Sequence, residues 1–390
     1  MKFGRNWGQL GMKCKLKDIC SFRKGKTDVA NLTPETYIST ENMLPNKNGV
    51  VISSSLPSVT LTQVYKKGDV LVSNIRPYFK KIWKAKFDGG CSNDVLVFIS
   101  KENIDDDFLY YVLSDDAFFS YCMATSKGTK MPRGDKKSIM QYEVPCYNTE
   151  TQQKIASVLK SMDEKIELNN AINNNLEQQA QAIFSNEFLT LETLLDGWKQ
   201  ASLIDVADYL NGLAMQKYRP TADETGIPVL KIKELRQGCC DNNSEMCSPN
   251  IKSEYIIHDG DVIFSWSGSL LVDFWCGGIC GLNQHLFKVS SSKYDKWFYY
   301  AWTKHHLDRF IAIAADKATT MGHIKRDELA KAEVLIPTEA DYNRIGALLQ
   351  PIYDLIIANR IENKKLAETR DSLLPKLMSG EIDISEVDYE

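Results

Sequence analysis

The 390-residue sequence lacks the marks of a membrane or exported protein. No apolar run reaches the ~18–20 residues that a membrane-spanning helix needs. The N-terminal residues MKFGRNWGQLGMKCK contain no apolar stretch of the kind that a secretion signal has. The ten cysteines are scattered, without the spacing of a small disulfide-rich domain. We therefore expect reduced thiols and a cytoplasmic protein.

Recognisable catalytic motifs are also missing. Residues 25–27, GKT, resemble the end of a phosphate-binding loop, but Cys20 stands where that loop requires glycine. Residues 74–78, NIRPY, superficially resemble the Asn-Pro-Pro-Tyr loop of DNA amino-methyltransferases. The consecutive prolines are absent, and no glycine-rich cofactor loop follows a strand. These absences argue against an enzyme.

Cysteine and histidine do not form a convincing metal site. Cys276 and Cys280 have the spacing of one ligand pair, and Cys239, Cys240 and Cys247 lie upstream. Structural zinc usually needs two such pairs, so buried free thiols are the preferred interpretation. The sequence has only five histidines. We predict no catalytic residue, no metal and no cofactor for this chain.

Positive charge is not in surplus, because 47 Lys and Arg face 51 Asp and Glu, for a net charge of −4. Phosphate neutralisation needs surplus Lys and Arg, so the total argues against a nucleic-acid binder. The distribution changes this conclusion. Residues 1–150 hold 22 basic and 16 acidic residues, whereas the remainder holds 25 and 35. The first part therefore has the electrostatics of a phosphate-contacting domain.

The sequence repeats itself at an offset of about 190 residues. The matched pairs are LKDI at 16–19 with LIDV at 203–206, GDVLVS at 68–73 with GDVIFS at 260–265, FLYY at 108–111 with WFYY at 297–300, and VP at 144–145 with IP at 336–337. The pairs occur in one order, with offsets from 187 to 192. This pattern indicates a tandem duplication.

Each repeat begins with a segment of strand-like pattern. Short apolar runs lie between Gly, Pro, Asn and Ser clusters, which predicts a mixed, mostly β globule. The predicted strands include 70–72, 95–99, 262–264 and 285–289. Helices are expected at 107–120 and 297–313, and basic residues 231 and 233 alternate as on one strand face.

Each repeat ends in a long helical segment, from 149 to about 188 and from 341 to about 378. Apolar residues recur every seven positions, and both helices carry Asn at matched points of this seam, which is typical of a coiled coil. The Asn residues are Asn169, Asn173, Asn359 and Asn363. Each apolar stripe must be buried, and the duplicate helix is the obvious partner.

An antiparallel pairing is expected, with Asn169 facing Asn363 and Asn173 facing Asn359, because a buried amide needs a polar partner. In this register Met162 falls opposite Arg370, which is a mismatch. The predicted fold class is α+β. It has two tandem β-rich domains, each followed by a long helix, and the helices pair as an antiparallel coiled coil with pseudo-two-fold symmetry.

The full layout resembles the specificity (S) subunit of type I restriction–modification systems. The segments that carry the resemblance are GDVLVS at 68–73, GDVIFS at 260–265, QQKIA at 152–156, YNRIG at 342–346 and RDSLLPKLMSGEI at 370–382. The last is the most specific, and the resemblance covers essentially the whole chain. One departure is ADYN at 340–343, where the family often has a Gln-rich helix start.

The resemblance implies a non-catalytic subunit with two target-recognition domains, each reading one half of a bipartite, asymmetric site on double-stranded DNA. The helices act as a spacer and dock two methyltransferase subunits, and restriction (translocase) subunits join that core. S-adenosylmethionine, ATP and Mg²⁺ then belong to the partners. The expected boundaries are 1–148 and 191–340 for the two domains, 149–190 and 341–380 for the helical spacers, and 381–390 for a tail.

Candidate DNA-contacting residues lie in polar, basic loops at matching places of the two repeats, because Arg, Lys, Asn, Ser and Thr suit phosphates and base edges. In the first repeat they are Arg76, Tyr78, Lys80, Lys81, Lys127, Thr129, Lys130, Arg133, Lys136 and Lys137. In the second they are Lys231, Lys233, Arg236, Trp266, Ser267, Ser269, Lys317, Thr319, Thr320, His323, Lys325 and Arg326.

Two alternatives stay open. One is a protein-interaction scaffold with two β-rich modules on a coiled-coil rod, without sequence-specific DNA binding. The other is a modification enzyme, which needs a cofactor loop that this sequence lacks.

Overall fold

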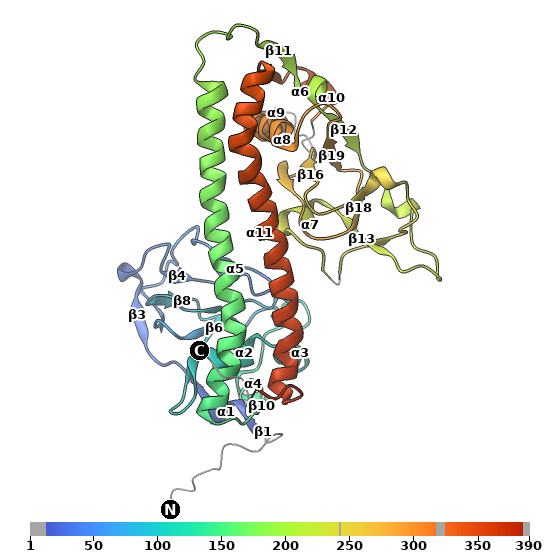
Figure 1. The fold of residues 1–390 in the computed structure, drawn as a ribbon. Helices are drawn as coiled ribbons and strands as arrows, with labels where there is room; N and C mark the ends of the chain where they lie inside the picture. The colour runs from blue at the N-terminus through green and yellow to red at the C-terminus, as the bar shows by residue number, and fades with distance from the viewer. Residues whose placement is uncertain (1–12, 242, 317–323, 385–390) are drawn as a thin grey trace, which may run out of the picture. The chain divides into compact units, whose positions relative to one another are not determined.

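A computed structural model of the chain describes residues 13–241, 243–316 and 324–384. The chain divides into two compact units, Met1–Glu164 with Ala367–Glu390 (unit 1) and Lys165–Leu366 (unit 2). Each unit therefore contains one β-rich globule and a part of each long helix (Figure 1). Within the described residues, no helix combines the length and apolar character that crossing a membrane requires.

Unit 1 is built on two four-stranded sheets and one two-stranded sheet. The first sheet has the order β2 (Cys20–Phe22), β9 (Val95–Ser100), β6 (Val70–Ser73), β7 (Ile82–Lys84). The second has the order β3 (Lys26–Asp28), β5 (Leu61–Tyr65), β8 (Gly89–Cys91), β4 (Tyr37–Ile38). A separate pair joins β1 (Lys13–Lys15) to β10 (Glu143–Pro145).

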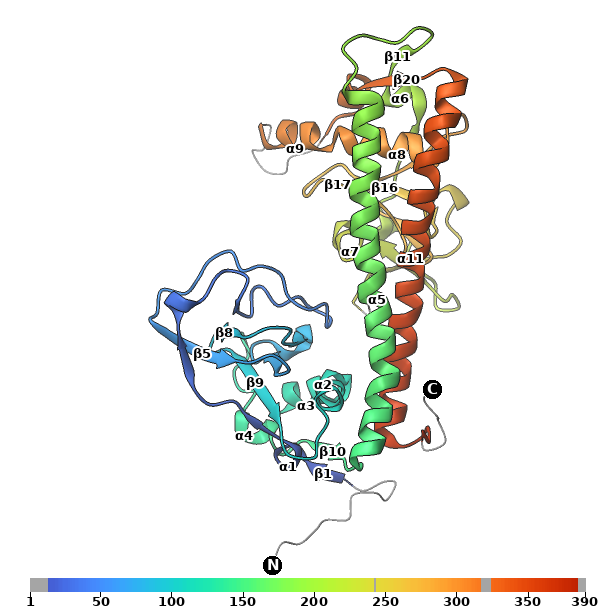
Figure 2. The same ribbon diagram turned by 60° about the vertical axis from the view of Figure 1, so that its left-hand side comes forward.

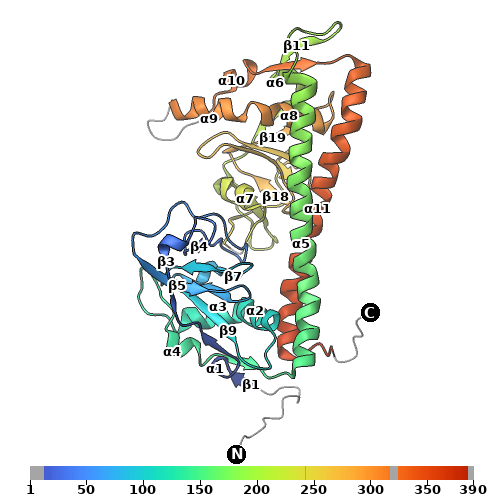
Figure 3. The ribbon, with the colours of Figure 1, turned by 90° about the vertical axis from the view of Figure 1, so that its left-hand side faces the viewer.

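The helices of unit 1 cover the first sheet. They are α1 (Leu16–Ile19), α2 (Asp106–Ser114), α3 (Asp116–Ala124) and α4 (Lys136–Ile139). Figure 3 shows α2 between β9 and the long helix α5 (Thr149–Phe184). A large apolar core of unit 1 joins β6 and β9 to α2, α3 and the end of helix α11 (Glu339–Ser379), where Leu374 and Leu377 are buried.

Unit 2 repeats this plan. Its first sheet has the order β12 (Asp208–Asn211), β19 (Leu286–Ser290), β16 (Val262–Ser265), β17 (Leu271–Phe274). Its second has the order β14 (Met246–Cys247), β13 (Ile227–Leu230), β18 (Cys280–Leu282), β15 (Ile256–Ile257). The two-stranded sheet pairs β11 (Lys199–Ser202) with β20 (Glu333–Ile336). The first sheets of the two units have the same strand order, and in the second sheets β8 and β18 each have one parallel and one antiparallel neighbour. The second sheets differ in the fourth strand, because β3 joins the antiparallel neighbour β5 in unit 1 and β14 joins the parallel neighbour β13 in unit 2.

The helices of unit 2 are α6 (Leu203–Val206), α7 (Ile232–Gln237), α8 (Lys296–His305), α9 (Leu307–Asp316) and α10 (Arg326–Ala330). Helix α8 is buried and aromatic, and it packs between the first sheet and the long helices (Figure 2). Tyr300 stacks on Phe274 of β17 at 3.9 Å between ring centroids and meets Tyr353 of α11 edge-on at 5.0 Å. Aromatic packing of this kind contributes beyond the area that it buries.

The repeated Gly-Asp dipeptide has a structural reason in both units. Gly68 and Gly260 have φ of +91° and +86°, a left-handed conformation that glycine adopts without strain. The following carboxylate closes the turn, since Asp69 accepts from the Lys66 amide at 2.8 Å and Asp261 from the His258 amide at 2.9 Å. Each also pairs with a basic residue of the same globule, Arg23 in unit 1 and Lys288 in unit 2.

The long helices are joined by the Asn pairs proposed from the sequence. Asn169 Nδ2 donates to Asn363 Oδ1 at 2.8 Å, and Asn359 Nδ2 donates to Asn173 Oδ1 at 2.9 Å. Asn169 and Asn173 are nearly fully buried. The paired residues ascend along α5 and descend along α11, so these two helices run in opposite directions within unit 2.

Two expectations for local structure were wrong. Residues 232–237 form the helix α7 rather than a strand, because Glu234 accepts from the Lys231 amide at the helix start and left-handed Gly238 ends it. His285 lies in a turn before β19, where Asn283 accepts its amide hydrogen at 3.2 Å. The expected mismatch of Arg370 with Met162 is compensated, because Arg370 forms an ion pair with Asp163.

Candidate nucleic-acid interface

Three polar segments of unit 1 converge where β6 ends. The amide of Arg76 donates to Pro132 O at 2.8 Å, and the amide of Gly134 donates to Asn74 O at 3.1 Å. These bonds join the loop after β6 to the basic loop at 127–134. The amide of Asn74 also donates to Asp94 O at 2.8 Å, which adds the turn between β8 and β9. The two basic loops predicted from the sequence are therefore in contact.

Unit 2 brings the equivalent segments together at the end of β16. The amide of Ile324 donates to Trp266 O at 3.0 Å, so the chain after 323 meets the loop at 266–269. Ser267 Oγ lies 3.1 Å from His285 Nδ1, which adds the turn between β18 and β19. We call each convergence a three-segment site, formed by residues 74–81, 92–94 and 127–134 in unit 1 and by 266–269, 283–285 and 324–326 in unit 2.

The loop after β6 in unit 1 has an unusual backbone conformation at two residues. Arg76 and Lys80 have φ of +51° and +50° and flank the short helical turn Pro77–Phe79. Non-glycine residues rarely adopt this conformation, and such strain is concentrated at functional sites. Tyr78 is 48% exposed, with its ring 4.6 Å from that of Phe79. An exposed aromatic pair beside a basic loop is suited to contacts with sugars and base edges.

The predicted cations of unit 1 differ in how far the protein already neutralises them. Lys80 pairs with Asp116 at 2.7 Å and Arg133 with Asp94 at 3.0 Å, and Lys127 lies 3.8 Å from Asp135. Lys81 donates to the carbonyl of Thr40, and burial lowers the pKa of its ammonium group. Lys136 lies over the ring of Phe22, 5.8 Å from its centroid.

The remaining basic residues of that set have exposed side chains. Arg76, Lys130 and Lys137 have no ion pair with any described residue and are the cations most available to an anionic ligand. Thr129 is exposed in the same loop. Unpaired Lys and Arg give up no existing partner when they neutralise phosphate, so we rank these three above the paired ones.

The predicted residues of unit 2 divide in a similar way. Lys231 pairs with Glu245 at 2.5 Å, and Lys233 pairs with Asp241 at 2.9 Å. The Asp241 hydrogen bond raises the pKa of Lys233. Arg236 is exposed on α7. The two lysines are thus largely neutralised.

The loop after β16 is polar but packed. Trp266 is half-buried, and its Nε1 donates to Asn211 Oδ1 at 3.0 Å. Ser267 is buried, and the carbonyl of Ser269 accepts from Ser265 Oγ at 2.9 Å. Lys325 and Arg326 are exposed at the start of α10. Lys317, Thr319, Thr320 and His323 lie outside the described residues.

The sequence predictions missed one segment in each unit, the turn that precedes β9 in unit 1 and β19 in unit 2. It contains Ser92, Asn93 and Asp94 in unit 1 and Asn283, Gln284 and His285 in unit 2. A signal was present, since an uninterrupted polar run directly precedes each apolar strand. No group of three His, Cys, Asp or Glu in the described parts of the chain can hold a metal ion.

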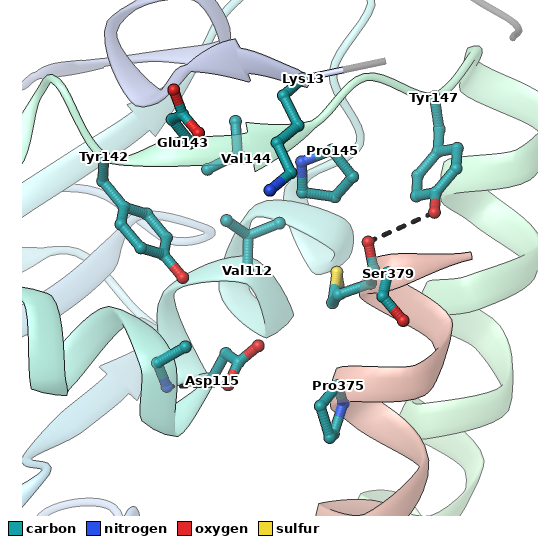
Figure 4. A pocket seen from close by; sticks show the side chains of 12 residues that line it. Lys13, Val112, Asp115, Tyr142, Glu143, Val144, Pro145, Tyr147, Pro375 and Ser379 are labelled. Carbon is teal, nitrogen blue, oxygen red and sulfur yellow. Dashed lines mark hydrogen bonds between the residues drawn. The ribbon is translucent and has the colours of Figure 1, made fainter. Parts of the chain in front are cut away.

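A cavity of about 470 Å³ lies elsewhere in unit 1, and none of the predicted DNA-contacting residues line it. Figure 4 shows Tyr142 and the β10 residues Glu143 to Pro145 on one side and Pro375 and Ser379 of α11 on the other. Tyr147 Oη donates to the carbonyls of Leu377 and Met378 at 3.2 and 3.3 Å. This cavity marks where the end of α11 joins the first globule.

Comparison with known proteins agrees with the duplicated fold. The model of the type I restriction–modification DNA specificity domain matches the chain twice, at residues 11–178 and 195–368. The MjaIX specificity subunit of Methanocaldococcus jannaschii, a type I restriction enzyme subunit, is 24% identical over 96% of this chain and 94% of its own length. The HindI specificity subunit of Haemophilus influenzae, also of a type I restriction enzyme, is 21% identical over 81% of this chain and 87% of its own length.

A solved structure has the same fold. The crystal structure of the S subunit of a type I restriction–modification system from M. genitalium superimposes with a TM-score of 0.56 at 16% identity, covering 97% of this chain and 98% of that one. The two matches to the family model span most of the chain, and they coincide with the two repeats. The chain therefore belongs to the family of type I restriction–modification DNA specificity subunits, and like them it is not itself an enzyme.

Proposed function

We propose that this chain selects the DNA sequence for a type I restriction–modification complex, each three-segment site reading one half of a bipartite, asymmetric site. The observation that carries the proposal is that both units bring equivalent polar segments together at the end of equivalent strands, β6 and β16. The side chains differ between the two sites, and an asymmetric target needs two readers of different chemistry. The proposed domains keep the boundaries 1–148 and 191–340.

We also propose that α5 and α11 form an antiparallel coiled coil that sets the half-site spacing and binds two methyltransferase subunits. The buried Asn pairs support a defined register. Leu168 and Ile172 of α5 and Leu348 and Leu355 of α11 are exposed, and apolar residues on a helix surface suit a protein partner. Restriction subunits would join this core, and S-adenosylmethionine, ATP and Mg²⁺ would be bound by the partners.

The proposal is tested by purifying the chain with the methyltransferase subunit encoded beside it and mapping the methylated DNA sites. We expect two short half-sites separated by a fixed gap. Replacing residues 1–150 with the matching domain of another family member should change one half-site and leave the other unchanged. Methylation without sequence preference would contradict the proposal and favour the interaction scaffold.

The unpaired lysines of unit 1 should contribute to affinity without reading sequence. We expect the double variant Lys130→Gln/Lys137→Gln of the assembled complex to bind all DNA sequences more weakly. The slope of log K against log salt concentration should fall by about 0.9 per lost phosphate contact. The measurement is a fluorescence binding titration at several salt concentrations.

The matched control for this test is Lys66→Gln. Lys66 also belongs to unit 1 but is paired with Asp88 at 2.8 Å, and it precedes β6, whereas the three-segment site follows that strand. For Lys66→Gln, the slope of log K against log salt concentration should equal that of the wild type. An unchanged slope in the double variant would remove Lys130 and Lys137 from the interface.

A further inference from the structure

A second cavity, of about 310 Å³, opens at the three-segment site of unit 2. The residues that line it are Gln216, Lys231, Ile232, Lys233, Asn283, Gln284 and His285. They come from the short turn Met215–Lys217, from the start of α7 and from the turn between β18 and β19. The contact between Ser267 Oγ and His285 Nδ1 joins this cavity to the loop after β16.

The charge of the cavity does not suit a phosphate group. Its two lysines are already paired, Lys231 with Glu245 and Lys233 with Asp241, so each ammonium group faces a carboxylate of the same unit. A phosphate oxygen would have to displace those carboxylates. The carboxylates would also repel the negatively charged DNA backbone at short range.

The polar groups that remain are amides and an imidazole. Gln216 is exposed, and its side chain has no hydrogen bond to a described residue. The side-chain amide of Gln284 contacts His285 Nε2 at 3.3 Å. A Gln amide carries a donor and an acceptor side by side, which matches the N6 and N7 edge of adenine. Uncharged amides of this kind distinguish base edges from phosphates.

The turn that carries Gln284 is held in place before any ligand binds. The backbone amide of Gln284 donates to Leu213 O at 2.9 Å. The buried side chain of Asn283 accepts from the backbone amide of His285 at 3.2 Å. Ser267 and Gln284 contact the two ring nitrogens of His285, which sets the plane of the ring. A side chain on a rigid turn loses little entropy on binding, and this favours specific recognition.

The equivalent turn of unit 1 has different chemistry. There Asp94 pairs with Arg133 at 3.0 Å, so an acidic residue stands at the position that His285 occupies in unit 2. The same turn thus presents an ion pair in one unit and an imidazole beside the Gln284 amide in the other. This difference is what two readers of unlike half-sites need.

We propose that Gln216, Gln284 and His285 form the base-reading pocket of unit 2, which recognises a base edge in the major groove of double-stranded DNA. The inference rests on the proposed function and adds the residues that determine one half-site. Gln284 makes the main contact, because it combines a free acceptor with a fixed backbone. Lys231 and Lys233 support the pocket wall through their ion pairs.

The test uses the complete chain assembled with its methyltransferase subunits and a pool of double-stranded DNA with randomised half-sites. Methylated molecules are sequenced to give the preference at each position. We expect Gln284→Ala to reduce discrimination about 10- to 100-fold at one or two adjacent positions of one half-site, as loss of a bidentate base contact predicts. Gln216→Ala should act at the same or a neighbouring position.

Two controls make the result interpretable. Gln200→Ala removes an amide from the exposed strand β11 and should leave every preference unchanged. The half-site read by unit 1 serves as an internal control, because its unchanged preference shows that a variant complex is folded and active.

Four outcomes decide between the possibilities. Loss of preference confined to one half-site supports the pocket. Unchanged preference at all positions in both Gln216→Ala and Gln284→Ala, with a wild-type complex that selects a bipartite site, overturns it. A uniform loss of affinity with a smaller salt slope also overturns it, because that result marks a phosphate contact. A wild-type complex without any sequence preference would instead reject the proposed function.

Discussion

Replacement of Arg370 by Leu is expected to lower the free energy of unfolding of unit 1 by about 3–5 kcal/mol. Arg370 Nη1 lies 2.5 Å from Asp163 Oδ1, and the two side chains are only 17% and 23% exposed. Tyr111 Oη donates to the other carboxylate oxygen at 2.8 Å. Removal of the guanidinium leaves Asp163 mostly buried with one neutral partner, and an uncompensated buried charge is costly.

The electrostatics of this network agree with that expectation. Burial alone lowers the pKa of the Arg370 guanidinium, but the Asp163 and Asp371 carboxylates more than offset this effect and hold the pKa above its ordinary value. Burial and then the Asp163 charge raise the pKa of Tyr111, so its hydroxyl stays protonated and donates.

A double-variant cycle tests the explanation. Asp163→Leu/Arg370→Leu should recover most of the loss, because replacing both members of a buried pair with apolar residues is often neutral. Lys66→Leu, which breaks the exposed pair with Asp88, should cost less than about 1 kcal/mol. Hydrogen exchange of the 106–124 peptides during urea titration measures each effect. A cost below 1 kcal/mol for Arg370→Leu alone would show that the pair is solvated.

Leu377→Ala is expected to destabilise unit 1 by about 2–5 kcal/mol. Leu377 is 2% exposed at the end of α11, and it shares an apolar core with Ile155 and Leu159 of α5. A cavity at this position removes contacts from both the helices and the first globule, because the core extends to α2 and α3. The segment 370–382, which carries the most specific family resemblance, is therefore predicted to contribute to the core of unit 1.

The same helix supplies the control. Leu355→Ala removes the same atoms from a side chain that is 45% exposed, so its cost should stay within about 0.5 kcal/mol. Urea unfolding, followed by hydrogen exchange at 70–73 and 95–100, gives the stability of the first sheet. Equal effects of the two variants would mean that the end of α11 is not packed in solution.

Several features of the fold could be predicted from sequence because they depend on local pattern. The duplication is visible in the Gly-Asp turns, since a left-handed glycine followed by a turn-closing carboxylate is encoded within four residues. The four strands named from the sequence each begin and end within one residue of a strand in the structure. The helical pattern at 232–237 was missed, because a short segment with alternating Lys residues fits both periods.

The candidate site was predicted only in part. Sequence reasoning located the loops after β6 and at 127–137, since basic residues beside turn formers stand out in the chain. It did not locate the turns at 92–94 and 283–285. Their polar residues gain meaning only where hydrogen bonds such as Asn74 to Asp94 bring three distant segments together.

The amino-acid sequence by itself determined the family, the two repeats and the Asn positions of the long helices, because each is written in residue order and spacing. The tertiary structure decided which cations of unit 1 remain without an ion pair among the described residues. Arg133 lies 39 positions from Asp94, and Lys80 lies 36 from Asp116, so their neutralisation arises only when the chain folds. Coulomb attraction depends on distance in space, and composition alone therefore overstated the positive charge that unit 1 presents.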